Sequence, residues 1–162
     1  MKIVVIGAGV IGTSVAARLA ERGATVTLVD QAAPGTGTTS TSYAWVNSNG
    51  KEPVAYYDLN LAGLEAHARL SPEGEAGWLG HGGHVEIAVD DHHRDDLAAR
   101  LRRLGAAGYG ADEITSERAR ELLPDVDVPE GAQLIAHFPR ETYAYPFKYL
   151  AHALGAARAR DT

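Results

Sequence analysis

The chain has 162 residues, of which 22% are charged, and it carries a formal net charge of -6 and no cysteine. The acidic balance argues against nucleic-acid and anionic membrane partners, and the lack of cysteine excludes disulfides, thiolate metal sites and thiol catalysis. It also suits a reducing compartment, so we expect a cytoplasmic protein. No apolar run reaches the roughly 20 residues of a spanning helix, and glycines end the N-terminal apolar run too early for a signal peptide.

The first 29 residues predict a strand, a helix and a second strand. Lys2–Ile6 is continuously apolar after the lysine, which is typical of a parallel strand covered on both faces. Over Val10–Arg22 the apolar residues recur every four positions, which predicts a helix whose stripe is Ile11, Val15 and Leu19. Gly23 then stands where a C-terminal cap belongs, and the β-branched run Thr25–Val29 predicts the second strand.

The rest of the chain begins with a long loop. Residues 31–49 are rich in Gly, Thr, Ser and Asn, and we expect an ordered, functional loop with one helical turn near 40–45. Beyond it, strands are predicted at 84–89 and 132–138. Helices are predicted at 53–70, 94–104, 117–123 and 146–160, the last with Pro146 in its first turn.

A glycine motif joins the first strand to the first helix. Gly7, Gly9 and Gly12 match G-x-G-x-x-G, and Asp30 follows roughly 20 residues later, at the end of the second strand. In such a unit the glycines permit a tight turn, the approach of a pyrophosphate and close helix packing, while the acid binds the adenosine ribose and repels a 2'-phosphate. The motif therefore predicts an adenine dinucleotide other than NADP, although the glycines alone would also make a turn without a ligand.

NAD and FAD share this half-site, and the stretch PGTGTTSTSYAW after the second strand distinguishes them. With it, the chain resembles the FAD-dependent oxidoreductases that include D-amino acid oxidase, glycine oxidase and sarcosine oxidase, the DAO family. The resemblance covers residues 2–50 and is weaker over 82–154, in GGHVEIAVD, LGAAGYGADEITSERARELLPDV and YPFKYLAHALGAA. It implies an α/β fold with a Rossmann-like FAD-binding βαβ unit of the glutathione-reductase type and the beginning of an α+β substrate domain.

The resemblance also implies roles for individual residues. Beside the three glycines, backbone amides of Val10 and Ile11 would lie at the pyrophosphate, and Asp30 and Gln31 at the ribose. The hydroxyl cluster of Thr38, Thr39 and Ser40 would contact phosphate or ribityl oxygens, and the flavin ring would be lined by Tyr43, Ala44 and Trp45. Asp30 stands where glutamate is commoner, and Tyr145 stands before Pro146 where the family tends to have Asp. A turn whose hydroxyls satisfy only its own backbone is the alternative.

Several other side chains have weaker claims to function. The histidines at 81, 84, 92 and 93 have metal-like spacing, but without cysteine or a compact acidic set we interpret them as surface residues and expect no metal. The tyrosines at 56, 57, 143, 145 and 149 are interpreted as packing residues rather than the wall of a substrate cavity. The sequence assigns no catalytic side chain, since in this chemistry the flavin accepts the hydride.

The resemblance further implies an incomplete unit, because members of the family are typically more than twice this long. We expect residues 1–50 to start an FAD-binding domain followed by a helical segment (51–80), residues 81–140 to form part of a substrate-type domain, and residues 141–162 to return as a helix. The expected function is FAD-dependent oxidation of a small amine or amino acid, such as a D-amino acid or glycine, with the chain as an N-terminal part that is inactive alone. A non-catalytic FAD- or ADP-binding remnant is the rival, and an NAD-dependent dehydrogenase domain is a third interpretation.

The same incompleteness has a physical consequence. Unpaired strand edges and an uncovered apolar face on the last helix would promote self-association or binding of a C-terminal partner chain.

Overall fold

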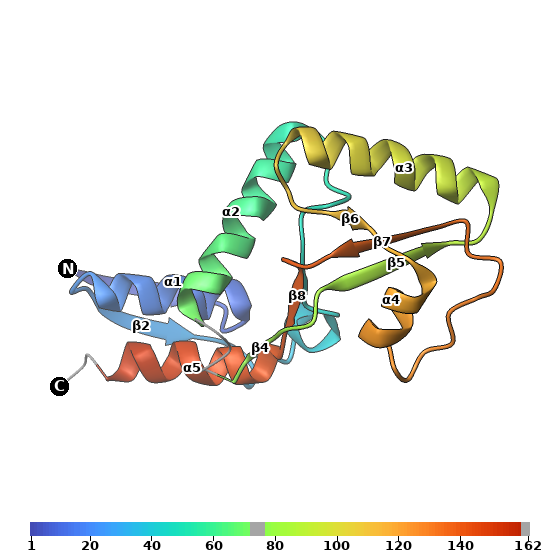
Figure 1. The fold of residues 1–162 in the computed structure, drawn as a ribbon. Helices are drawn as coiled ribbons and strands as arrows, with labels where there is room; N and C mark the ends of the chain where they lie inside the picture. Colours follow the sequence, from blue (N-terminus) through green and yellow to red (C-terminus); the bar gives the residue numbers. More distant parts are fainter. Residues whose placement is uncertain (72–76, 160–162) are drawn as a thin grey trace. The chain divides into compact units, whose positions relative to one another are not determined.

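The computed structural model describes residues 1–71 and 77–159, which form two compact units. The first unit comprises residues 1–44, 70–71, 77–80 and 143–159, and the second comprises residues 45–69 and 81–142. Between Ala44 and Trp45 the chain passes from the first unit into the second. Each unit is described by itself below (Figure 1).

The first unit is built on a strand–helix–strand motif. Strand β1 (Lys2–Ile6) pairs in parallel with β2 (Thr25–Val29), with Lys2 opposite Thr25 and Ile6 opposite Val29. Helix α1 (Val10–Glu21) connects the two strands and packs on them, and helix α5 (Pro146–Arg158) packs against α1. These four elements confirm the sequence prediction. The predicted end of the last helix, at Arg160, lies outside the described residues.

The buried face of α1 differs from the predicted stripe. Ile11 is 77% exposed and Val15 is also exposed, whereas the buried residues are Thr13, Ala16, Ala17 and Ala20. This second set is also spaced at i, i+3, i+4 and i+7, so it forms a face of its own. Its small side chains let the helix backbone approach its neighbours closely, which is why the packing selects it over the bulkier stripe.

Helix α5 also corrects an expectation, because its apolar face is covered. Tyr149, Leu150 and Ala153 are buried, and the Tyr149 hydroxyl lies 2.7 Å from that of Ser14 on α1. The helix begins at Pro146, and the side chain of its N-cap residue, Tyr145, makes no capping hydrogen bond. A short antiparallel pair precedes it, in which β4 (Leu79–Gly80) lies beside β8 (Thr142–Ala144) through Leu79 opposite Ala144.

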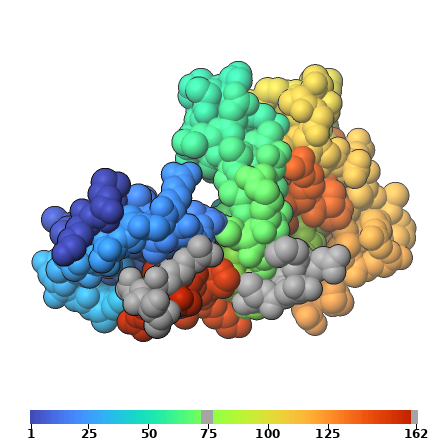
Figure 2. Space-filling view, turned by 90° about the vertical axis from the view of Figure 1, so that its left-hand side faces the viewer, coloured from blue at the N-terminus to red at the C-terminus, as the bar shows by residue number. Residues whose placement is uncertain are grey.

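One face of the β1–β2 pair is exposed, contrary to the predicted coverage of both faces. Side chains alternate along each strand, and the outward set includes Val4, Ile6 (86% exposed) and Val29. In the space-filling view of Figure 2 the N-terminal residues (dark blue) lie at the surface of this unit. Helix α1 packs on one face of the pair, and the side chains of β1 on the other face are exposed.

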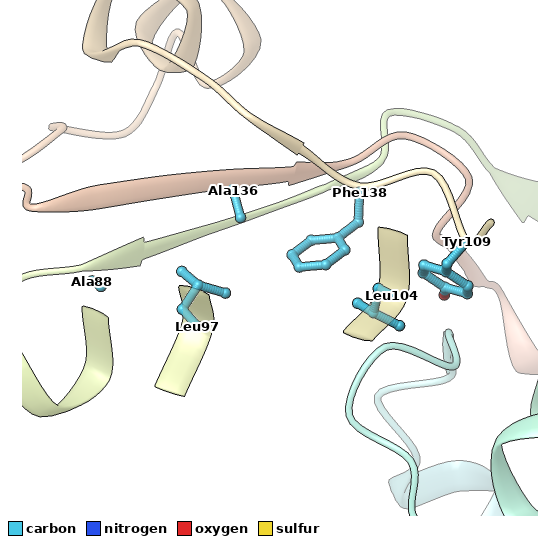
Figure 3. Packing of buried hydrophobic residues seen from close by; sticks show 6 residues of the cluster. All are labelled: Ala88, Leu97, Leu104, Tyr109, Ala136 and Phe138. Atoms are coloured by element: carbon cyan, nitrogen blue, oxygen red, sulfur yellow. The ribbon is translucent and has the colours of Figure 1, made fainter. Parts of the chain in front are cut away.

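The second unit packs helix α3 on an antiparallel sheet. The sheet has the order β5–β7–β6, formed by β5 (His84–Ala88), β7 (Leu134–Phe138) and β6 (Asp112–Glu113). Helix α3 (Asp91–Ala106) has Asp90 as its N-cap, and the Asp90 side chain accepts a hydrogen bond from the backbone N–H of His93. The buried cluster between helix and sheet is formed by Ala88, Leu97, Leu104, Tyr109, Ala136 and Phe138 (Figure 3).

The remaining elements of this unit are α2 (Val54–Leu70), α4 (Ser116–Leu122) and the short β3 (Trp45–Val46). A second buried cluster joins Ala119 of α4 to Ile135 of β7 and Val128. The predicted helices and long strands are thus confirmed, with α3 three residues longer at its start. The expected helical turn at 40–45 is instead a 3-10 helix, η1 (Thr38–Thr41), and the sequence did not predict the short strands β3, β4, β6 and β8.

Candidate functional site

The turn between β1 and α1 depends on two of its glycines. Gly7 has φ +103°, a conformation that other residues rarely adopt. A Cβ on Gly12 would lie 1.7 Å from the carbonyl oxygen of Gly7, so only glycine lets the helix start this close to the strand. The sequence assigned these roles to the motif, and the geometry accords with them.

The N-terminus of α1 offers backbone amides to a ligand. The hydrogen bonds within the helix start with Thr13, whose N–H donates to the carbonyl of Gly9 at 3.0 Å, and the first turn has neither an acidic residue nor a side-chain cap. The N–H of Val10 donates to Oγ1 of Thr39 at 3.1 Å. Such a helix end carries partial positive charge and suits an anionic group such as a diphosphate.

A groove of about 960 Å³ opens over this turn. It is lined by nine of the residues that the sequence analysis selected: Gly7, Gly9, Val10, Ile11, Gly12, Asp30, Gln31, Thr38 and Thr39. Its other lining residues are Val5, Ile6, Val15, Ala32, Gly35, Thr36, Gly37 and Ser42, which the sequence analysis did not select. Half of this second set belongs to the same hydroxyl-rich stretch, for which the composition of the loop was the available signal. Ser40, Tyr43, Ala44 and Trp45 do not line the groove.

The hydroxyls of the loop divide into two groups. Those of Thr36, Ser40 and Thr41 donate to carbonyl oxygens of the loop itself, as in an ordinary Ser/Thr turn. Thr39 is buried, and its hydroxyl reaches the first amide of α1 instead. A Cβ on Gly9 would lie 3.2 Å from that hydroxyl, so the glycine makes room for it. Thr38, Thr39 and Ser42 line the groove without donating to the loop's own carbonyls, and of these the Ser42 hydroxyl accepts the N–H of Ala44 at 2.9 Å.

Asp30 connects the second strand to the glycine turn. Its Oδ2 accepts the N–H of Ala8 at 2.6 Å, and its Oδ1 accepts the N–H of Ala32 at 2.9 Å. These backbone hydrogen bonds lower the pKa of the Asp30 carboxyl group, and the one from Ala8 has the largest effect. An ionised carboxyl group has about four acceptor positions, so two stay available for the hydroxyls of a ribose.

The loop is held beside the turn by glycine and by α5. The N–H of Gly35 donates to the carbonyl of Ala8 at 3.0 Å, and Gly35 has φ +82°. A Cβ there would lie 2.4 Å from Cδ1 of Leu150 and 3.0 Å from Cε1 of Phe147, so a larger residue would require these side chains to shift. The sequence analysis missed this contact because it joins segments more than 100 residues apart.

The three residues expected at a flavin ring lie in different surroundings. Tyr43 is 99% exposed, and Ala44 has φ +50° and accepts the N–H of Ala144 through its carbonyl. Trp45 belongs to the second unit, where its indole N–H donates to Oε2 of Glu141 at 3.1 Å. Their role toward a flavin stays a prediction.

The histidines are not all surface residues. His81 and His92 are exposed, but Nε2 of His93 lies 2.9 Å from Glu86, and His84 is half-buried beside Glu141. Burial raises the pKa of Glu86, but hydrogen bonds from His93 and Arg100 outweigh it, so the net shift is downward. Residues 1–71 and 77–159 contain no group of three potential metal ligands. Among the tyrosines, Tyr57 packs near Tyr109 and Tyr149 packs against Trp78, as predicted, whereas Tyr143 and Tyr145 are exposed.

Comparison with known proteins gives a consistent result. The sequence model of the family described as FAD dependent oxidoreductase matches residues 2–161. Among solved structures, L-proline dehydrogenase from P. horikoshii is 23% identical with a TM-score of 0.80 over 98% of this chain and 42% of its own. Glycine oxidase from Geobacillus kaustophilus is 21% identical with a TM-score of 0.82 over 97% of this chain and 44% of its own.

A third solved structure, L-α-glycerophosphate oxidase from Mycoplasma pneumoniae with FAD bound, is 17% identical with a TM-score of 0.78 over 98% of this chain and 42% of its own. At these identities the likeness establishes the fold, and this chain spans less than half the length of each of the three. No curated protein matches the sequence. In the described residues no helix is long and apolar enough to cross a membrane.

Proposed function

We propose that this chain, which belongs to the family of FAD-dependent oxidoreductases, binds FAD and forms the N-terminal part of an enzyme that oxidises a small amine or amino acid. The observation that carries the proposal is the groove over the N-terminus of α1, where Thr39 accepts the N–H of Val10 and the Asp30 carboxyl group lies alongside. A diphosphate and a ribose need this combination of a helix N-terminus and a nearby acid.

The residues present fit FAD. The first-turn amides of α1 would hold the diphosphate, Asp30 and Gln31 would lie at the adenosine ribose, and Thr38 and Thr39 would contact phosphate or ribityl oxygens. Ser40, Tyr43, Ala44 and Trp45 would extend the site toward the flavin ring. Bound FAD supplies the hydride acceptor for the C–H bond next to the substrate nitrogen. The first unit would thus serve as the FAD-binding domain and the second as part of the substrate domain. The absence of cysteine supports the cytoplasm as the location.

Titration with FAD tests the cofactor and the loop together. We expect the folded chain to bind FAD, and we expect Thr38→Ala/Thr39→Ala to weaken binding about 10- to 100-fold, since each lost hydrogen bond costs about 0.5–1.5 kcal/mol and those to charged groups more. The matched control is Thr27→Ala/Thr41→Ala, which removes two hydroxyls that do not line the groove. The measurement is isothermal titration calorimetry or quenching of flavin fluorescence.

Four outcomes would change the assignment. Equal affinity of the double variant and the wild type would remove Thr38 and Thr39 from the site. A folded chain that binds neither FAD nor ADP would refute the cofactor, and one that binds NADH but not FAD would favour a dehydrogenase domain. A chain that binds FAD but oxidises no amine, alone or with a complementary C-terminal chain, would be the non-catalytic remnant.

The exposed sheet face supports a proposal about assembly. Val4, Ile6 and Val29 form an apolar face on a two-stranded sheet, and Ile11 and Val15 are further exposed apolar residues on α1. We propose that a C-terminal partner chain covers this surface, and that the chain self-associates through it when alone.

Light scattering tests this surface. We expect the isolated wild type to self-associate, and Val4→Thr/Ile6→Thr to reduce the self-association, since threonine keeps the strand preference and lowers the apolar area. The control, Val89→Thr/Val126→Thr, changes two exposed valines elsewhere and should leave it unchanged. A wild type that is monomeric at all concentrations and melts sharply would contradict the proposal.

A further inference from the structure

A buried carboxyl group lies in the second unit, outside the groove described above. Glu141 is 1% exposed and follows β7 in a tight turn, with its N–H donating to the carbonyl of Phe138. Its Oε1 accepts the hydroxyl of Tyr109 at 2.8 Å, and its Oε2 accepts the indole N–H of Trp45 at 3.1 Å. Burial is the largest cause that raises the pKa of the Tyr109 hydroxyl, and the nearby Glu141 raises it further. The hydroxyl therefore keeps the proton that it donates.

His84 is the third group against this carboxyl. Its Nδ1 is buried and lies 3.3 Å from Oε2 of Glu141, an ion-pair distance without the alignment of a full hydrogen bond. The ring is clamped between two aromatic rings, edge-on to Trp45 at 4.6 Å and stacked on Phe138 at 5.3 Å. The side chain is nevertheless 28% exposed, and because Nδ1 is buried, the exposed part lies elsewhere on it.

This arrangement matches the chemistry of an oriented base. A carboxyl group beside Nδ1 attracts a proton to that nitrogen and leaves Nε2 as the acceptor. A purely structural histidine would not need a buried acid on one nitrogen together with an exposed remainder.

We propose that His84, oriented by Glu141, is the catalytic base that takes a proton from the ammonium group of the amine substrate. The inference rests on the proposed function and deepens it. In this step the N–H bond of the ammonium group breaks, the proton moves to Nε2 of His84, and the electron pair stays on nitrogen. No oxidation occurs in it. The neutral amine can then lose hydride from the adjacent carbon to FAD, which is reduced as the C–N bond becomes C=N.

Other ionisable groups lie around His84 besides Glu141. On its own strand, Glu86 interacts electrostatically with His84 and is itself paired with His93 and Arg100 on α3. On β7, the ring of His137 lies over Gly83, next to His84 in the chain, with Nε2 of His137 2.6 Å from a Cβ placed there.

The first test reads the tautomer without requiring turnover. In ¹⁵N NMR spectra of the FAD-loaded chain, neutral His84 should carry its proton on Nδ1, and Glu141→Gln should mix the two tautomers. His84→Ala assigns the resonance, and His92→Ala is the control at an exposed histidine. A neutral His84 protonated on Nε2 in the wild type would overturn the inference, because that nitrogen could then not accept the proton of the substrate.

The second test measures anaerobic bleaching of FAD by glycine, L-proline or benzylamine, in the chain or in its complex with the complementary chain. At neutral pH, His84→Ala should react about 100-fold more slowly or worse, in line with the loss of a general base. The difference in rate between His84→Ala and the wild type should shrink as the pH rises past the pKa of the amine. Added imidazole should restore part of the rate of the variant. His92→Ala should behave as the wild type.

The outcomes separate this inference from the proposed function. A His84→Ala variant with a constant deficit at all pH values and no response to imidazole would reduce His84 to a structural residue. Bleaching by none of the amines would also overturn the inference, because His84 would have no reaction to serve, while measured FAD binding would leave the cofactor assignment intact. Failure of FAD binding in the wild type would instead refute the proposed function itself.

Discussion

Gly12→Ala is expected to destabilise the first unit by about 1–3 kcal/mol or more and to abolish most of its FAD affinity. The added Cβ would meet the carbonyl oxygen of Gly7 at 1.7 Å and its carbonyl carbon at 2.9 Å. These are backbone atoms of the turn itself, so no side chain can move aside to relieve the clash. Relief requires separating α1 from β1, which displaces the amides that would hold the diphosphate.

The matched control is Gly155→Ala, the same substitution in helix α5 of the same unit. Nothing lies within 4 Å of the Cβ position there, and Gly155 is exposed. Alanine should stabilise this helix by up to about 1 kcal/mol, since glycine is the poorer helix former. Urea unfolding and FAD titration of both variants make the comparison. Equal stability and affinity for the two would show that the close approach at Gly12 is not needed.

The parts of the site that depend on residues close to one another in the sequence could be predicted from the sequence. Gly7, Gly9 and Gly12 report a local turn, and their spacing is sufficient to place them between a strand and a helix. The contact of Thr39 with Val10 joins residues 29 apart, and the contact of Gly35 with Leu150 joins residues farther apart still. Composition indicated a functional loop there, but the choice of Thr39 over Ser40 required the fold.

Helix α1 shows how a correct element can be assigned the wrong face. Its larger apolar residues Ile11 and Val15 give the stronger hydropathy signal, yet the alanine face is the buried one. Close packing of α1 against both the sheet and α5 favours small side chains, and hydropathy patterns do not report distance between backbones. Strands such as β4 and β6 are two residues long, too short for any period to be detected.

Buried polar residues were the largest gap in the sequence analysis. Glu141 lies in the polar stretch PRETY, whose composition is typical of an exposed turn. Its burial depends on Tyr109 and Trp45, which arrive from distant segments, and Ser48 adds a further link by donating its N–H to the Tyr109 hydroxyl at 2.8 Å. The interpretation of His84 as a surface residue failed for the same reason, since its partners are remote in the chain.

This network leads to the second large expected effect. Glu141→Ala should destabilise the second unit by about 2–4 kcal/mol, because it leaves the buried Tyr109 hydroxyl without its acceptor and opens a void. Trp45 is half exposed, so its indole N–H can turn to water and should contribute little of this cost. Its fluorescence should instead shift to longer wavelength, which Trp78, the other tryptophan, cannot mimic because it is fully buried in the first unit.

Two variants make the measurement of Glu141 specific. Glu130→Ala removes an exposed carboxyl group from the same unit and should change the unfolding free energy by less than about 0.5 kcal/mol. Glu141→Gln keeps one acceptor oxygen but places an amide N–H₂ among donors, so its cost should fall between the two alanine variants. If Glu141→Ala unfolds at the same urea concentration as Glu130→Ala, the carboxyl group does not hold the network together. The orientation of His84 would then depend on the rings of Trp45 and Phe138 alone, which fix the plane of the imidazole but not which nitrogen carries the proton.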